Sequence, residues 1–440
     1  MAMQILAGIG CGVILGAAIA CLPGMHVYNI LGLLVILGGA SPAAQVTEFS
    51  LPFIAAMITS WAILNSLTSI LLAAPDESAM FTILPGQQYL LAGRGREAVL
   101  LTVVGGFGGL LVFLGGITLG APFLPAIRSV LQPHFHWMLW AIIAFMLMSE
   151  WPQSRLIGEY GWRNWLTACR GCGVGILTFS LSGFLGLILM NRPLIHHTNA
   201  FQGLMPAFVG MFAIPPAIIN LLGRIPIPPQ SPMPRRLDIS FYHFLKGVFC
   251  GTLGGSFATF VPAISGGVGG MLAGHATAQR DARVFLIAQG ASKTVYYVGG
   301  LLLFFLPDLR ASHGGGALLI RVLNPLPTLN DYLLIVAAAL VAGAGACMLA
   351  APCTDGMLKI IRSVPQTIVA WATLSIMVLL VCVLSGASGL AVMLVGAAIG
   401  LLPIVFGSRR MNCLGLVLLP VACNMSGIGP MVAESLGLFR

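Results

Sequence analysis

Two adjacent carboxylates, Asp76 and Glu77, directly follow an apolar run that spans residues 51–73. The same run carries side-chain oxygens at Asn65, Ser66, Thr68 and Ser69. Hard cations such as Na⁺ prefer carboxylate, hydroxyl and carbonyl oxygens. The pattern therefore predicts a coupling-cation site that includes Ser66, Thr68 and Asp76. The alternatives are that the carboxylates only solvate a loop and that the hydroxyls bond to carbonyls of their own helix.

A lysine, Lys293, stands near the middle of a second apolar run, residues 285–306. A charge in mid-span is costly and indicates a function. We predict that its ammonium group binds a carboxylate of an anionic substrate. Three neutral polar side chains nearby could add hydrogen bonds: Gln289, Ser292 and Thr294. The alternatives are a structural ion pair with a buried carboxylate, such as Glu150 or Asp355, or a lysine that extends to the membrane interface.

The elements that carry these residues are predicted to be membrane-spanning helices. Hydrophobic residues make up 58% of the 440-residue chain, and charged residues only 8%. Apolar runs of about 20 residues, the length that a helix needs to cross a bilayer, recur along the sequence. Clear examples are residues 51–73, 98–119, 285–306 and 332–350. The sequence therefore predicts an all-α polytopic protein, located in the cytoplasmic (inner) membrane.

Other readings of the composition are less well supported. The first 24 residues lack a basic start and are interpreted as a first span rather than a cleaved signal. The net charge of +9 indicates cytoplasmic loops rather than nucleic-acid binding. The ten cysteines lie mostly in or beside apolar runs and predict no disulfide framework, and the pair Cys169 and Cys172 lacks further metal ligands at a suitable spacing.

The sequence also contains an internal repeat. Residues 5–24 align without gaps on residues 244–263, which pairs Gly8, Gly12, Gly16 and Pro23 with Gly247, Gly251, Gly255 and Pro262. Between the halves lies a linker with five prolines from Pro226 to Pro234. We therefore predict a first transmembrane repeat over residues 1–223, a cytoplasmic linker over 224–243 and a second repeat over 244–440.

Charge distribution indicates how the two repeats are oriented. With seven hydrophobic passes per half, 15 of the 21 Lys and Arg residues fall on one face and five on the other, with Lys293 inside a span. The positive-inside rule then places the loop 93–97 and the linker in the cytoplasm and both termini outside. In this reading Arg94 and Arg96 are topology anchors. An odd number of passes makes the repeats inverted, so we predict two inverted repeats and about 12–14 membrane segments.

Broken or re-entrant helices are predicted after Pro23 and Pro262. Proline ends a helix, and short polar or glycine-rich segments follow it in both halves. Helix N-termini that reach the membrane midplane would favour an anion. These segments and the neighbouring spans supply the remaining candidate substrate ligands: Gly24, His26, Asn29, Asn65, Ser265, Gly266 and Gly267.

Three stretches of the sequence resemble a known family. They are "LPGMHVYNI", "APDESAMFTILPGQQYLLAGRGREAVLLTVVGG" and "FLKGVFCGTLGGSFATFVPAISGG". They are similar to the large membrane subunit, or permease, of tripartite tricarboxylate transporters, in particular a shorter branch that is often seen in archaea. The longer bacterial pattern has Asp-Gly-Tyr-Pro where this chain has "ILPGQQYL".

The resemblance implies a secondary active transporter of small carboxylates, di- or tricarboxylates, coupled to a sodium or proton gradient. It also implies two possible partners, a small membrane subunit and an extracytoplasmic substrate-binding protein. A homo-oligomer is a further possibility. An ion channel and an intramembrane enzyme are the alternatives. The sequence lacks an H-E-x-x-H, a G-x-S-x-G and a Walker A motif, which argues against an enzyme and against an ATP-driven pump.

Overall fold

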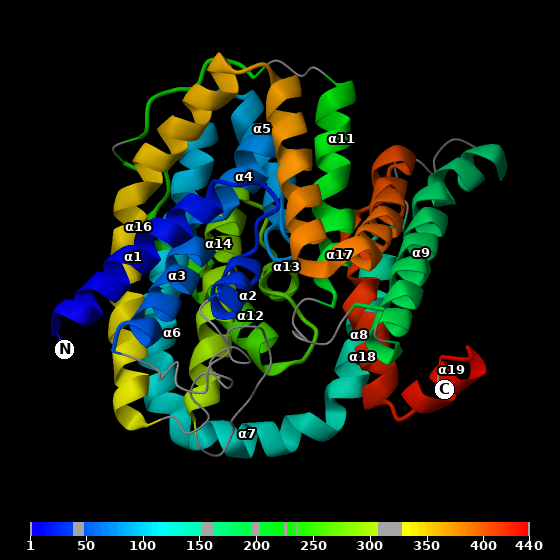
Figure 1. The fold of residues 1–440 in the computed structure, drawn as a ribbon, viewed down its shortest axis with the longest axis horizontal. Coiled ribbons are helices and arrows are strands. Elements are labelled where there is room, and N and C mark those ends of the chain that lie inside the picture. Colours follow the sequence, from blue (N-terminus) through cyan, green and yellow to red (C-terminus); the bar gives the residue numbers. More distant parts are fainter. Residues whose placement is uncertain are drawn as a thin grey trace. The chain divides into compact units, whose positions relative to one another are not determined.

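The computed structural model describes residues 2–37, 48–151, 162–192, 194–195, 203–223, 227–234, 236–306 and 328–438. Within these ranges every regular element is a helix (Figure 1). Contacts divide the chain into two compact units. The first contains residues 1–129 and 220–373, and the second contains residues 130–219 and 374–440. Each unit therefore takes a part of both sequence halves.

The first unit contains the candidate chemistry. Its helices from the first half are α1 (Ala2–Ala20), α2 (Val27–Leu37), α3 (Ser50–Leu64), α4 (Ser66–Leu72), α5 (Ile83–Leu91) and α6 (Gly95–Gly120), with 3₁₀ turns η1 (Met80–Thr82) and η2 (Ala121–Phe123). Those from the second half are α12 (Phe241–Phe260), α13 (Gly266–Ala276), α14 (Ala282–Leu302) and α16 (Leu329–Ser363), with the turn η6 (Leu303–Phe305).

The second unit is smaller. It contains α8 (Phe135–Met148), α9 (Trp162–Asn191), α10 (Met205–Phe208), α18 (Gly415–Met425) and α19 (Gly429–Ser435), with the turns η3 (Gln132–His134), η5 (Val209–Ala213, π-helical) and η7 (Arg410–Leu414). Three helices cross from one unit to the other: α7 (Leu124–Leu131), α11 (Ile214–Leu222) and α17 (Gln366–Phe406). Backbone at Gly386, with φ of +64°, kinks α17.

Glycine faces let the helices of the first unit pack closely. A Cβ atom on Gly12 of α1 would lie 2.5 Å from the carbonyl oxygen of Phe53 and 2.9 Å from the Cβ of Ala56, both on α3. In the second half, a Cβ on Gly251 of α12 would overlap the carbonyl oxygen of Ala288 on α14. Without a hydrophobic driving force between helices in lipid, such close backbone approach is what holds them together. The two glycine ladders, which the sequence aligns, thus each pack on a neighbouring helix, α3 in the first half and α14 in the second.

Both predicted proline breaks are present. Helix α1 ends at Ala20, and Gly24 adopts a left-handed φ of +73° before α2 begins at Val27. Helix α12 ends at Phe260, ahead of Pro262, and α13 begins at Gly266. Proline cannot donate a helical hydrogen bond, so the chain leaves the helical path at each of these two points.

The structure adds a break that the sequence did not reveal. The predicted span 51–73 is divided at Asn65 into α3 and α4. Helix α4 then ends at Ala73 with a left-handed φ of +52°. The interruption at Asn65 is slight, because its backbone stays in the right-handed helical region and its amide still bonds to the Trp61 carbonyl at 2.8 Å.

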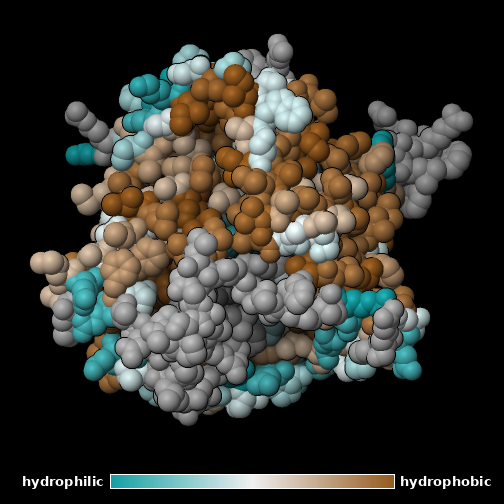
Figure 2. All heavy atoms as spheres, viewed as in Figure 1, coloured by the Kyte–Doolittle hydropathy of each residue, from teal (hydrophilic) through white to brown (hydrophobic). Residues whose placement is uncertain are grey.

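The length and composition of the helices fit a membrane protein. Among the described residues, seven helical stretches are long and apolar enough to cross a membrane, or eight if the pair 410–425 and 429–435, bent by 114°, forms one span. Large apolar side chains also face outward, such as Met348 of α16, which is 80% exposed, and Ile14 of α1, which is 68% exposed. Figure 2 shows hydrophobic residues over much of the face in view. The finer count of 12–14 segments stays a prediction.

One end of the first unit is polar. Arg94 donates to both carboxylate oxygens of Glu97 at 2.7 Å, and Arg96 pairs with Asp355 at 2.7 Å. The linker is fastened here, because the side chain of Gln230 accepts a hydrogen bond of 2.8 Å from the amide of Gly95. The loop 93–97 and the described part of the linker therefore lie at one end, as expected if both are cytoplasmic. Linker residues 224–226 and 235 lie outside the described ranges.

Acidic and basic side chains also pair at the start of α14. Arg283 binds Asp281 at 2.8 Å and Asp238 at 3.3 Å. Hydrogen bonds from the Arg283 side chain lower the pKa of the Asp281 carboxyl. The charges that the sequence assigned to topology thus neutralise one another at the helix ends.

The glycine packing yields a matched test within α1. Gly12→Ala would force a methyl group against α3, and overpacking of this kind costs about 1–3 kcal/mol. Gly10, two residues away, has no atom within 4 Å of its would-be Cβ. We expect Gly12→Ala to lower the apparent melting temperature of purified protein in detergent and Gly10→Ala to leave it unchanged or raise it. Equal melting temperatures for both variants would contradict the packing described.

Topology can be tested with single cysteines in a cysteine-free background. Gln230 is only 8% exposed and would react poorly, so the exposed neighbour Ser231 is the better probe. We expect Ser231→Cys to resist an impermeant thiol reagent applied from outside and to react after the membrane is permeabilised. Met3→Cys, 84% exposed in α1, should react without permeabilisation. Reaction of Ser231→Cys from outside would overturn the orientation.

Candidate functional site

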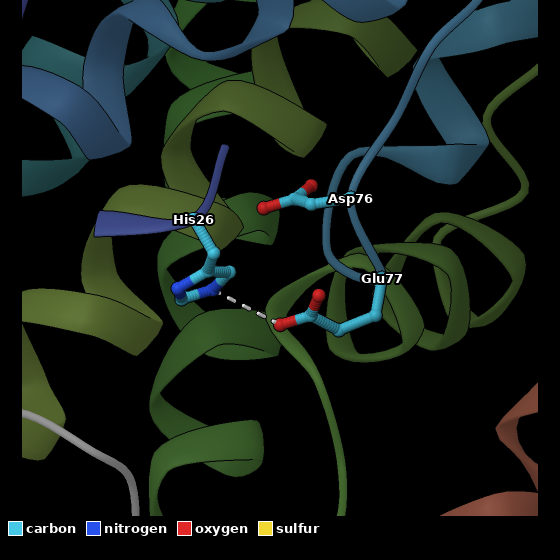
Figure 3. A group of neighbouring side chains, drawn as sticks. All are labelled: His26, Asp76 and Glu77. Atoms are coloured by element: carbon cyan, nitrogen blue, oxygen red, sulfur yellow. Dashed lines mark ion pairs between the residues drawn. The ribbon is translucent and has the colours of Figure 1, made fainter. Parts of the chain in front are cut away.

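Four interrupted or polar segments of the first unit meet at a cluster of ionisable side chains. His26 lies between α1 and α2, and Asp76 and Glu77 lie between α4 and η1. Ligand atoms of these three residues all lie within 4.8 Å of one another (Figure 3). Tyr297, on α14, completes the cluster from the second half of the sequence. We call these four residues the carboxylate cluster.

The imidazole of His26 is held in one tautomer. Its Nε2 atom lies 3.3 Å from Glu77 Oε1 and 3.1 Å from the Tyr297 hydroxyl. The backbone amide of Tyr28 donates to Nδ1 over 3.2 Å. A nitrogen that accepts a hydrogen bond carries no proton, so we assign the proton to Nε2. His26 is then a neutral donor, and its ring rests against Trp61, with ring centroids 4.6 Å apart.

This tautomer bears on metal binding. The spacing of His26, Asp76 and Glu77 would accommodate a metal ion. A metal-binding imidazole must present a bare nitrogen, however, and the nitrogen that faces the carboxylates carries the proton. The hydrogen-bond directions therefore favour an acid–base cluster over a metal centre.

Asp76 is fixed by three donors. Its Oδ1 accepts from the amide of Ala79 at 2.7 Å, and its Oδ2 accepts from the Asn65 side-chain amide at 2.8 Å and from the Ser78 hydroxyl at 3.0 Å. These bonds pin the carboxylate to the turn that follows α4 and to the break between α3 and α4. Asp76, which is partly buried, is therefore held in place by the fold and is not a freely solvated loop residue.

Lys293 joins the cluster through Asn65. Its ammonium group, on a residue that is 1% exposed, donates to Asn65 Oδ1, while the amide nitrogen of Asn65 donates to Asp76. Asn65 thus links a buried cation to a partly buried anion. Neither carboxylate suggested by the sequence is its partner: Asp355 pairs with Arg96, and Glu150, in the second unit, accepts from Ser408, Arg409 and Asn412.

The Tyr297 hydroxyl contacts the other three side chains of the cluster and also that of Ser78. It lies 2.9 Å from Ser78 Oγ, 3.3 Å from Asp76 Oδ2 and 3.2 Å from Glu77 Oε1, in addition to its contact with His26. Sequence reasoning missed both Tyr297 and Ser78. The available signal was position: Tyr297 follows Lys293 by one helical turn, and Ser78 follows the two carboxylates.

The start of α13 closes on the same region. Ser265 donates to the carbonyl of Glu77 at 3.2 Å and caps α13 by accepting from Val268. Ser292 of α14 donates to the carbonyl of Gly266 at 2.6 Å. A Cβ on Gly267 would meet the carbonyl oxygen of Ser78 at 2.5 Å. Four predicted substrate residues thus hold the second broken helix beside the cluster.

Other predicted ligands bond elsewhere. Ser66 pairs with Thr102 at 2.8 Å, and Thr68 and Thr294 donate to carbonyls of their own helices. Asn29 is buried near His26, and its backbone N–H donates to the His26 carbonyl at 3.0 Å. Gln289 is 1% exposed, and neither polar atom of its side chain has a partner among the described residues. The roles given to these residues, and to Gly24 in the first break, stay predictions.

Comparison with known proteins identifies the family. The profile described as "Tripartite tricarboxylate transporter TctA family" matches residues 6–415. The chain belongs to this family. It is therefore a multi-pass protein of the cytoplasmic membrane and a relative of permeases rather than of enzymes.

One curated relative is of archaeal origin. An uncharacterized protein of Methanocaldococcus jannaschii, MJ1079, is 27% identical over 290 residues, which cover 66% of this chain and 65% of the relative. The chain thus aligns with just under two thirds of that protein's length. No solved structure matches the chain.

The Asn65 bridge gives a stability prediction. Asn65→Leu keeps the side-chain bulk but leaves Lys293 and Asp76 each without a buried hydrogen bond, and each loss costs about 1–3 kcal/mol. We expect a lower apparent melting temperature for the purified protein in detergent. Thr68→Val, one turn away, removes only a hydroxyl that donates to the backbone carbonyl of Asn65, leaves the Asn65 side chain intact and should have little effect. A stability loss in Thr68→Val as large as in Asn65→Leu would contradict the bridge.

Proposed function

We propose that this chain is a secondary active transporter of small organic anions, of the di- and tricarboxylate class, driven by a sodium or proton gradient. Family membership supports transport, and one observation supports the location of the substrate site. A buried ammonium group, Lys293, lies where both broken helices meet the carboxylate cluster. Intramembrane charges in such positions mark substrate and ion pathways.

Lys293 retains the capacity to bind a carboxylate. An ammonium group has three N–H donors, and among the described residues Lys293 uses one of them, on Asn65. Gln289 lies four residues earlier on the same face of α14, with its amide unpartnered in the described part of the chain. Buried polar groups are normally hydrogen-bonded, so both residues are suited to receive a polar ligand.

We also propose that the two halves, residues 1–223 and 244–440, are inverted repeats joined by the Pro-rich linker. The matched packing of Gly12 on Ala56 and of Gly251 on Ala288 supports this arrangement. So does the presence of a helix break at the aligned prolines. Inverted repeats with discontinuous helices give a carrier two equivalent states that open to opposite sides of the membrane.

The partners of the transporter are also a proposal. The name of the family describes a three-component system. We therefore expect a small membrane subunit and an extracytoplasmic binding protein to be able to assist this chain. Reconstitution of the purified chain alone would show whether it transports without them.

The proposed function predicts a specific loss in Lys293 variants. In proteoliposomes, uptake of labelled citrate and succinate should saturate and should show exchange. Lys293→Met removes the charge and keeps the bulk, and the loss of a charged hydrogen bond costs about 1.5–3 kcal/mol, or about 10- to 150-fold in affinity. Lys293→Arg should retain part of the binding.

The matched control is Lys246→Met, which removes a lysine from α12 at a partly exposed position. It should bind and transport like the unmodified protein. Normal binding and transport by folded, monodisperse Lys293→Met would show that Lys293 is structural. Absence of saturable uptake or exchange for every carboxylate tested would reject the proposed function.

A further inference from the structure

We infer that the Asp76–Glu77 pair binds one proton, shared through the Tyr297 hydroxyl, and that this proton is the coupling ion. The inference rests on the proposed function, because it assigns an ion to the transport cycle of that carrier. It names which of the two possible gradients drives the carrier and which side chains sense it.

The first argument is charge. Asp76 and Glu77 each carry one negative charge when ionised, and Lys293, linked through Asn65, supplies one positive charge. His26 is neutral because its Nδ1 accepts a hydrogen bond from Tyr28. No arginine or second lysine contacts either carboxylate in the described part of the chain. The cluster is therefore one positive charge short, and both carboxylates are only partly accessible to water, which makes an uncompensated charge costly.

The second argument is the geometry of Tyr297. Its hydroxyl lies 3.3 Å from Asp76 Oδ2 and 3.2 Å from Glu77 Oε1, but it carries a single hydrogen. It can therefore donate to only one of the two carboxylates at a time. One added proton completes the chain: the protonated carboxyl donates to Tyr297, and Tyr297 donates to the other carboxylate. Two adjacent carboxylates that share one proton titrate as a pair.

Donors around the carboxylates favour a proton over Na⁺. A sodium ion needs several oxygen lone pairs that point at it. Asp76 already accepts from Asn65, Ser78 and Ala79. The Nε2–H group of His26 points at Glu77 and would repel a metal cation. A proton needs a single lone pair, and Ser66 and Thr68, which the sequence offered as cation ligands, bond elsewhere.

The groups that influence the pair come from three sides. His26 and Tyr28 approach from the first break and α2, and Lys293, Tyr296 and Tyr297 approach from α14. The neighbouring parts of α3 and α13 contribute the uncharged side chains of Trp61 and Ser265. The step itself is an addition: a proton from the medium forms an O–H bond with one carboxylate oxygen, and no electrons are transferred.

Protonation also fits the binding of an anion. A substrate carboxylate next to Lys293 would add negative charge to a cluster that already has an excess. Uptake of a proton by the Asp76–Glu77 pair removes one negative charge and so favours substrate binding. Proton and substrate then stabilise each other's binding by the same free energy.

The test uses the purified full-length chain in proteoliposomes, with membrane potential clamped at zero by potassium and valinomycin. Labelled citrate and succinate are the probes, and the readouts are steady-state accumulation and exchange. One coupled proton raises the accumulation ratio of a transported anion species about tenfold for each pH unit of gradient. We expect that dependence in the unmodified protein, and no dependence on an imposed Na⁺ gradient.

The variants Asp76→Asn and Glu77→Gln each remove one negative charge and resemble the protonated pair. We expect them to retain exchange while accumulation no longer follows the pH gradient. Asp355→Asn, which removes a carboxylate paired with Arg96 away from the cluster, should keep the dependence. Exchange with accumulation that follows Na⁺ alone would overturn the inference and leave the proposed function intact. Proton coupling that both variants retain would also overturn the inference. The absence of any exchange would overturn both the inference and the proposed function.

Discussion

A single amide side chain joins the buried charges of the first unit. Asn65 accepts from the ammonium group of Lys293 and donates to the carboxylate of Asp76. Each of these ions would be costly to bury alone in an apolar helix bundle. Because Asn65 sits at the break between α3 and α4, its side chain can face both partners. The path of the backbone and the electrostatics of the site therefore depend on the same residue.

Much of the architecture could be predicted from the sequence, and the reasons are local. Apolar runs predicted the helices later found as α6 and α16, and prolines predicted where α1 and α12 end. The break at Asn65 was missed because its neighbours include no proline or glycine. Periodicity reports which residues are buried, but it does not report a small local change in helix geometry.

The site was predicted only in part, because its contacts join distant segments. Lys293 and Asp76 were recognised as unusual by their position in or beside an apolar run. Their connection through Asn65 spans 228 residues of sequence, and the contact between His26 and Tyr297 spans 271. No local pattern encodes such pairs. The tautomer of His26 likewise depends on a backbone amide, that of Tyr28, which any residue type could supply.

The interleaving of the two halves has a consequence for biogenesis. Helix α3 packs against α16, and α6 packs against α14. Helices that are synthesised early therefore pack against helices that are synthesised late. Gly105 of α6 fits closely only when Ile287 of α14 is in place. During synthesis, the polar residues that follow α4 enter the membrane long before Lys293 leaves the ribosome. The first half is therefore inserted before Lys293 can compensate its carboxylates, and completion of the second half is the event that allows the fold to close.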